Sequence, residues 1–123
     1  MPHCILEYSS NINDKVNLKK LLHDINTMLA GTGLFNLMNI KSRAVEHDLY
    51  VVGDGDSSRA FVALTISIFS GRPDDVKANI TESALQLLKD AFSTTLQEMK
   101  CSITVQIGDI HRESYRKIVN GKT

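Results

Sequence analysis

The sequence lacks an excess of charge of either sign, which excludes two classes of partner. It holds 14 acidic and 14 basic residues among 123. The basic residues are scattered, and only Arg112, Arg116 and Lys117 are loosely grouped near the end of the chain. Because no net positive field would attract nucleic acid or an anionic membrane surface, we expect neither as a partner.

A long hydrophobic run is also lacking. The longest apolar stretch, Phe61 to Phe69, contains Thr65 and Ser67. It is far shorter than the roughly 20 residues that a helix needs to cross a bilayer. The opening, Met1 to Ser10, has no basic segment followed by an apolar run, as a secretory signal peptide would have. These absences predict a cytoplasmic protein.

Cysteine and histidine are too few and too dispersed for a metal centre. Cys4 and Cys101 lie near opposite ends, and the four histidines form no pair at metal-ligand spacing. We expect two reduced thiols, with a disulfide as the less favoured alternative. Asp54, Asp56 and Ser58 suggest a calcium loop, but the later glycine and glutamate that such a loop requires are missing. This segment is therefore expected to be a turn.

What the sequence does contain is a strand–helix–strand pattern that occurs twice in one domain, 1–123. The helices are predicted from apolar residues at helical spacing, and the strands from short apolar or alternating runs. The first pseudo-repeat, about 2–56, is predicted to hold a strand over Pro2–Tyr8, a helix over about Asp14–Leu29, and a strand over about Ile40–Val52, broken near Glu46–Asp48. The second, about 60–110, is predicted to hold a strand over Phe61–Phe69, a helix over about Pro73–Met99, and a strand over Ser102–Ile110. One further helical turn is expected around Tyr115–Val119.

This pattern predicts an α/β fold of two layers. A helix between the strands of each half favours a parallel pair joined by a crossover. The result is a four-stranded mixed sheet with two helices on one face. The other face of the sheet then needs cover from further subunits, so a closed homo-oligomer is expected.

Proline at position 2 is the most informative single residue. If Met1 is removed, Pro2 carries a free secondary amine. Burial or nearby cations lower the pKa of such an amine toward neutrality. Such an amine can act as a general base. The alternative is an incidental proline. Pro2 opens a strand directly, which anchors it to the core.

Three basic residues are candidates for binding a carboxylate substrate. Arg72 lies between the end of an apolar strand and the start of a helix, and its planar fork matches a carboxylate. Lys41 and Arg43 occupy alternate positions in a strand and are expected to point to one face, whereas Ser42 points to the other. The alternative for all three is an ordinary solvent-exposed charge.

Taken together, the ordered motifs resemble the tautomerase superfamily, and most closely the 5-carboxymethyl-2-hydroxymuconate delta-isomerase family. They are the opening Met1-Pro2-His3, the segments Gly31-Thr32-Gly33-Leu34-Phe35 and Ile40-Lys41-Ser42-Arg43, and the strand that leads into Gly71-Arg72-Pro73. The resemblance covers nearly the whole chain.

The resemblance implies a homotrimer of duplicated βαβ subunits of the MIF type, with sheets around a central barrel and no metal or organic cofactor. It implies isomerisation of an unsaturated di- or tricarboxylate, a 2-hydroxymuconate-type dienol, to its conjugated keto form in homoprotocatechuate (4-hydroxyphenylacetate) catabolism. Pro2 would move the proton, Arg72 would bind a carboxylate, and Lys41 or Arg43 would polarise the far end.

One departure and two alternatives stay open at this point. Lys41 stands where the family tends to carry arginine, and lysine offers a point charge instead of a bidentate fork. A non-catalytic ferredoxin-like module that binds a ligand or a protein would suit two βα-containing repeats, with antiparallel pairing. An inactive tautomerase-like scaffold is the other alternative.

Overall fold

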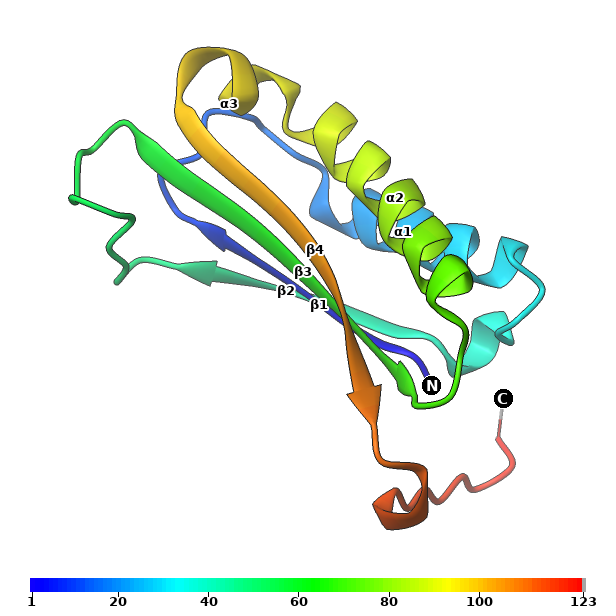
Figure 1. Cartoon of the computed structure of the whole chain (residues 1–123). Helices are drawn as coiled ribbons and strands as arrows, with labels where there is room; N and C mark the ends of the chain where they lie inside the picture. The colour runs from blue at the N-terminus through cyan, green and yellow to red at the C-terminus, as the bar shows by residue number, and fades with distance from the viewer. Residues whose placement is uncertain (123) are drawn as a thin grey trace.

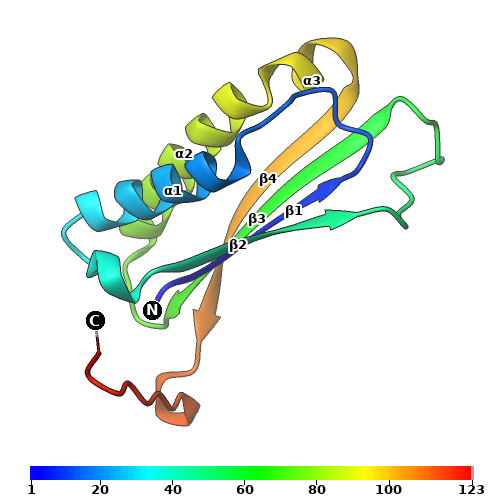
Figure 2. The same ribbon diagram turned by 180° about the vertical axis from the view of Figure 1, so that it is seen from behind.

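The chain forms a four-stranded sheet with its helices on one face (Figures 1 and 2). The computed structural model describes residues 1–122. α1 and α2 lie side by side across the sheet, so the predicted two-layer α/β arrangement is confirmed. In chain order the elements are β1 (His3–Ser9), α1 (Leu18–Gly31), the 3₁₀ turn η1 (Leu37–Asn39), β2 (Lys41–His47), β3 (Arg59–Phe69), α2 (Asp74–Ala91), α3 (Ser93–Glu98), β4 (Lys100–Ile110) and the 3₁₀ turn η2 (Arg112–Ser114).

Each half of the chain contributes one parallel pair of strands. β1 pairs with β2 and β3 pairs with β4 in parallel, while β1 and β3 meet antiparallel in the middle. The order across the sheet is β2-β1-β3-β4. This confirms the duplicated strand–helix–strand plan. It also differs from the antiparallel pairing that the ferredoxin-like alternative requires.

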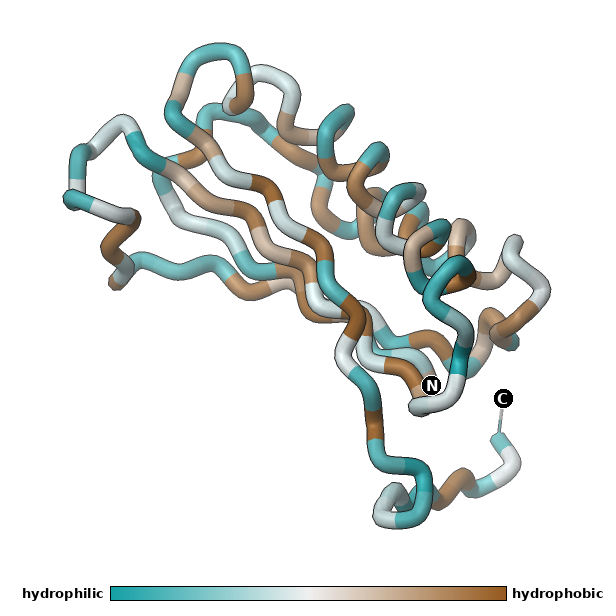
Figure 3. The backbone as a smooth tube through the Cα atoms, viewed as in Figure 1, coloured by the Kyte–Doolittle hydropathy of each residue, from teal (hydrophilic) through white to brown (hydrophobic). Residues whose placement is uncertain are grey.

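The core lies between the sheet and the two long helices. Alternate residues of β1 and β3, such as Leu6 and Leu64, are buried toward the helices, and their neighbours on the opposite face are only half-buried. Figure 3 shows the same alternation along β4, where apolar and polar residues follow one another. Period two in the strands and one apolar stripe in each helix therefore build one shared core. Its helical side includes Ile25 and Leu88, both fully buried.

The first helix begins later than predicted. α1 starts at Leu18, with Asn17 as its N-cap, because the Asn17 side chain accepts a hydrogen bond of 3.1 Å from the Lys20 amide. Asp14, the predicted first residue, has another role. Its carboxylate accepts hydrogen bonds from the backbone of Thr94 and Thr95 at the start of α3.

The second helix is interrupted, which the prediction of one helix over Pro73–Met99 missed. α2 ends at Ala91 and α3 begins at Ser93, and Phe92 between them has φ −110° and ψ 30° and is completely buried. The apolar stripe continues through Phe92, so its spacing could not indicate the break. Pro73 precedes α2 as its N-cap instead of occupying the first helical position.

Two further boundaries differ from the prediction. β2 ends at His47 and does not reach Val52, because its partner β1 ends at Ser9, which pairs with His47. After β4 the chain forms a 3₁₀ turn over Arg112–Ser114, and the helical turn predicted around Tyr115–Val119 is wrong. The expected turn before β3 is present.

Free thiols are confirmed at Cys4, which is buried, and at Cys101. Within residues 1–122, no cluster of histidine, cysteine and acidic residues could hold a metal ion. The helices of the same residues are all too short or too polar to cross a membrane.

Candidate functional site

Pro2 lies at one end of the sheet, where three strands begin or end. β1 and β2 begin there and β3 ends there, since His3 pairs with Lys41 on one side and Ser67 on the other. Pro2 is fully buried, and its carbonyl accepts a hydrogen bond of 3.1 Å from the Lys41 amide. Figures 1 and 2 both place the N-terminus beside the end of β3. Pro2 is therefore held against the sheet, and in this chain Met1 precedes it.

Lys41 and Arg43 share the face of the sheet that points away from the helices. Both side chains are exposed, whereas Ser42 between them points to the helix layer and donates a hydrogen bond of 2.5 Å to Asn26 of α1. The Arg43 guanidinium lies 3.3 Å from Nδ1 of His3 on the neighbouring strand. The predicted orientation of these residues is thus present in the structure.

Asn39 brings three ammonium groups together beside Pro2. Its carbonyl accepts hydrogen bonds of 3.0 Å from the Met1 amino group and 3.2 Å from Nζ of Lys41. Its side-chain oxygen lies 3.4 Å from Nζ of Lys117, which comes from the C-terminal segment. The sequence shows Asn39 and Lys117 78 positions apart, so neither could be assigned to this place from spacing.

The charges around Pro2 change the pKa of its neighbours. The pKa of the Met1 amino group is lowered by partial burial and then by the positive charges of Lys41 and Lys117. The pKa of His3 is lowered by burial and then by Arg43 and other nearby cations. In both groups, burial and nearby positive charges disfavour the protonated form, so both pKa values are lowered.

The cations at this end have no acidic partner in the described part of the chain. The ion pairs of residues 1–122 involve other basic groups, such as Lys20, Lys77 and Arg59. Lys41, Arg43 and Lys117 contact backbone carbonyls, amides or histidine instead. An unneutralised group of cations is complementary to an anion with more than one carboxylate.

Arg72 lies at the same end of the sheet but contacts a different segment. It follows Gly71, whose φ of +107° suits glycine. Its guanidinium carbon lies 5.1 Å from the centre of the Phe35 ring, and Nη2 donates to the Leu34 carbonyl at 3.5 Å. None of the hydrogen bonds or ion pairs described within residues 1–122 joins Arg72 to Pro2.

The start of α2 adds little to anion binding at Arg72. Asp74 and Asp75 occupy the first turn of the helix, so the positive end of its dipole is matched by the chain's own carboxylates. The helix terminus therefore gives no independent support for an anion site beside Arg72.

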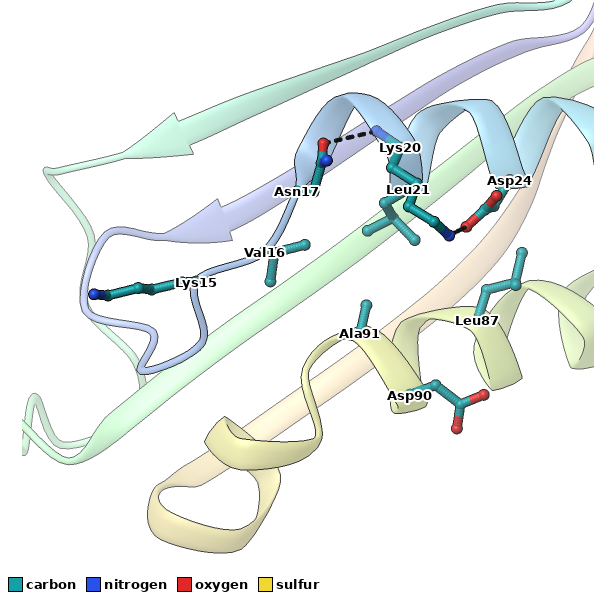
Figure 4. A pocket seen from close by; sticks show the side chains of 9 residues that line it. All are labelled: Lys15, Val16, Asn17, Lys20, Leu21, Asp24, Leu87, Asp90 and Ala91. Carbon is teal, nitrogen blue, oxygen red and sulfur yellow. Dashed lines mark hydrogen bonds and ion pairs between the residues drawn. The ribbon is translucent and has the colours of Figure 1, made fainter.

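A groove of about 460 Å³ lies between the start of α1 and the end of α2 (Figure 4). These helix ends lie away from the N-terminus (Figure 1). Its charges are mixed, because Lys20 and Asp24 form an ion pair of 2.8 Å and Asp90 lies nearby. It offers neither a nucleophile nor an unneutralised cation cluster. The Pro2 end is the better candidate for chemistry.

Comparison with known proteins identifies the family of the chain. The profile of the family described as 5-carboxymethyl-2-hydroxymuconate isomerase matches residues 2–121. The chain belongs to this family. A curated relative, 5-carboxymethyl-2-hydroxymuconate Delta-isomerase of Escherichia coli, is 32% identical over 111 residues, which cover 90% of this chain and 88% of the relative. Membership places the chain among isomerases of the tautomerase superfamily, and the resemblance seen in the sequence is confirmed.

Solved structures support the family and the fold. A 5-carboxymethyl-2-hydroxymuconate isomerase from Deinococcus radiodurans R1 superimposes with a TM-score of 0.89 at 26% identity and covers 97% of this chain and 90% of its own. A fused 4-OT protein, described as a symmetric trimer, superimposes with a TM-score of 0.74 at 14% identity over 98% of this chain and 94% of its own, which shows a shared fold.

Proposed function

We propose that this chain isomerises 5-carboxymethyl-2-hydroxymuconate to its conjugated keto form, with the nitrogen of Pro2 as general base after removal of Met1. The observation that carries the proposal is the buried Pro2 at the start of β1, beside a group of cations without acidic partners in residues 1–122. The family of the chain supplies the substrate class. No cofactor is required, because the reaction moves only a proton and a pair of double bonds.

In the proposed reaction, one nitrogen atom, that of Pro2, both removes the proton and returns it. The neutral amine of Pro2 takes the proton of the substrate's 2-hydroxyl group, and the oxygen electrons form the ketone. The double bonds shift along the chain, and a carbon further along takes the same proton back from the Pro2 ammonium. The amine must therefore be neutral at working pH, which requires a pKa below the usual value of about 8.

The surroundings of Pro2 support such a lowered pKa. The Met1 amino group has its pKa lowered by burial and by the charges of Lys41 and Lys117. An amine at Pro2 would lie one residue deeper in the same environment, since the side chain of Pro2 is fully buried. Desolvation and neighbouring cations both disfavour the ammonium form.

We assign the basic residues to binding the substrate carboxylates and to stabilising the negative charge that develops during the reaction. We assign Arg72 to one substrate carboxylate and Arg43 to another, because Arg43 is oriented by Nδ1 of His3 and its fork matches a carboxylate. Lys41 shares the Asn39 carbonyl with the amino terminus, so we assign it to the negative charge that develops on the dienolate oxygen. This division suits a point charge at Lys41.

A homotrimer is part of the proposal. The face of the sheet that carries Lys41 and Arg43 has no α-helix over it within residues 1–122, and a neighbouring subunit can cover it. A protein of the same fold is described as a symmetric trimer. Closure between subunits would also bring an Arg72, from the same chain or its neighbour, to Pro2. We place this trimer in the cytoplasm, acting in homoprotocatechuate catabolism.

The test compares two forms of the protein that differ only at the amino terminus. Chain with a C-terminal tag should lose Met1, as intact-mass measurement would detect, and should convert the dienol in a spectroscopic assay. Chain with a short uncleaved extension before Pro2 should fall in rate by about 10² to 10⁴, the usual contribution of a general base. Equal rates in both forms would exclude Pro2 as the base, and no activity in the Met1-free form would favour the inactive scaffold.

A further inference from the structure

The C-terminal segment lies beside the Pro2 end of the sheet, where an aromatic contact with β3 holds it. The ring of Tyr115 meets the ring of Phe69 edge-on at 5.0 Å and 88°. The guanidinium of Arg112 lies 4.4 Å from the centre of the Phe69 ring. Both views of the ribbon place this segment below the end of the sheet, on the side of the N-terminus (Figures 1 and 2).

Local hydrogen bonds fix the turn that precedes Lys117. The amide of Tyr115 bonds to the Arg112 carbonyl at 3.3 Å. The guanidinium of Arg116 donates to the carbonyls of Glu113 and Tyr115 at 2.8 and 3.0 Å. The next residue, Lys117, is thereby directed toward Asn39, whose side-chain oxygen lies 3.4 Å from Nζ.

Lys117 differs from the other cations of the site in where it originates. Lys41 belongs to β2 and Arg72 to the loop between β3 and α2, whereas Lys117 reaches the site from a segment beyond the last strand. Its charge acts on the Met1 amino group together with that of Lys41. None of the ion pairs of residues 1–122 involves Lys117, and Glu113, the acidic residue nearest to it in the sequence, pairs with His111 at 3.3 Å.

The proposed substrate has one more carboxylate than the basic residues assigned so far can bind, and Lys117 can bind it. The proposed substrate carries three, and the proposed function assigns two of them to Arg72 and Arg43. We take these two to be the carboxylates of the muconate skeleton. The third, on the carboxymethyl branch, needs a cation from another direction. Lys117 is an ammonium on a flexible stem at the same site. Among residues 1–122 its hydrogen-bond partner is the exposed side-chain oxygen of Asn39, which a carboxylate can replace.

We propose that Lys117 binds the carboxymethyl carboxylate of the substrate and thereby sets the preference for a tricarboxylate over a dicarboxylate. The inference rests on the proposed function and extends it to a specificity-determining residue outside the sheet. It predicts that the effect of removing the Lys117 charge depends on whether the substrate carries the branch.

The experiment measures KM and kcat for 5-carboxymethyl-2-hydroxymuconate and for 2-hydroxymuconate, which lacks the branch. Lys117→Gln should raise KM for the tricarboxylate by about tenfold, the scale of one charge-assisted hydrogen bond, with kcat nearly unchanged. KM for the dicarboxylate should change less than about twofold. Lys117→Arg should restore most of the affinity for the tricarboxylate.

Lys122→Gln is the matched control, because it removes one lysine charge from the same segment at an exposed position. It should leave both KM values unchanged. An equal rise in KM for both substrates in Lys117→Gln, or no rise for either, overturns the inference while the isomerase activity stands. Wild-type protein that isomerises neither substrate overturns the proposed function and this inference with it.

Discussion

Replacing Asp14 by alanine should destabilise the fold through the loss of three hydrogen bonds at the start of α3. One carboxylate oxygen accepts bonds from the amide and the hydroxyl of Thr95 at 2.8 and 2.7 Å, and the other accepts from the amide of Thr94 at 3.2 Å. Thr95 is completely buried. Its hydroxyl also accepts a bond of 3.0 Å from the amide of Asn13, so the carboxylate ties the segment before α1 to α3.

The expected loss follows from these contacts. Removing a capping side chain costs about 0.5 to 2 kcal/mol, and a buried donor without a partner costs about 1 to 3 kcal/mol. Since solvent can reach part of the segment around Asp14, which is half-buried, we expect a loss of about 2 kcal/mol in the free energy of unfolding. Urea unfolding at fixed protein concentration measures it.

The same contact predicts how stability depends on pH. Burial raises the pKa of Asp14, but the hydrogen bonds from Thr95 and Thr94 outweigh it, so the net pKa is lowered. A lowered folded-state pKa means that the contribution is full above the unfolded value of about 3.9 and is lost as pH falls through the folded value. The difference between wild type and Asp14→Ala should therefore be constant near neutral pH and shrink in acid.

Asp24→Ala is the matched control for Asp14→Ala. Asp24 forms an exposed ion pair with Lys20 one helical turn away, at 2.8 Å, which contributes at most about 0.5 kcal/mol. If Asp14→Ala costs no more than this control, or if its cost is unchanged in acid, the capping role of Asp14 is refuted.

Three further substitutions test other parts of the structure. Phe92→Ala should lower the free energy of unfolding by about 3 to 5 kcal/mol, because the ring is completely buried at the break between α2 and α3. A loss below about 1 kcal/mol in urea unfolding would contradict this packing. Arg72→Lys should raise KM for both muconates several-fold with a smaller effect on kcat, because a lysine cannot replace the fork, and an unchanged KM would remove Arg72 from the site. In an NMR titration, the pKa of the His3 ring should lie below the usual value of about 6.5, and Arg43→Gln should raise it again. A His3 pKa above the usual value in the wild-type protein would contradict the contact with Arg43.

The side-chain orientation along the strands was predictable, because it depends only on the alternation of residues between the two faces. Alternation along 41–43 predicts that Lys41 and Arg43 share one face and that Ser42 points to the other. The contact of Ser42 with Asn26 then shows that the face of Ser42 is the one toward the helices. The parallel pairing within each half was predictable from the helix between the strands.

Contacts between distant segments could not be predicted from local patterns. Phe92 fits the apolar stripe of one long helix, and only its packing reveals the break. Asp14 has the character of a residue in the first turn of a helix, yet its partners lie 80 positions along the chain. The position of Lys117 could not be predicted from any periodic pattern around it. It depends on the contact between Tyr115 and Phe69, which holds the C-terminal segment beside β3.

The central claim concerns the protonation state of one nitrogen, and it can be measured directly. Protein that carries ¹⁵N-labelled proline and lacks Met1 should show a single titrating amine at Pro2 by NMR. We predict that its pKa lies clearly below the usual value of about 8 and coincides with the acidic limb of the rate profile of the isomerisation. A Pro2 amine that titrates at or above that value in active enzyme, or a Pro2 nitrogen that stays an amide while the enzyme turns over, would contradict the account.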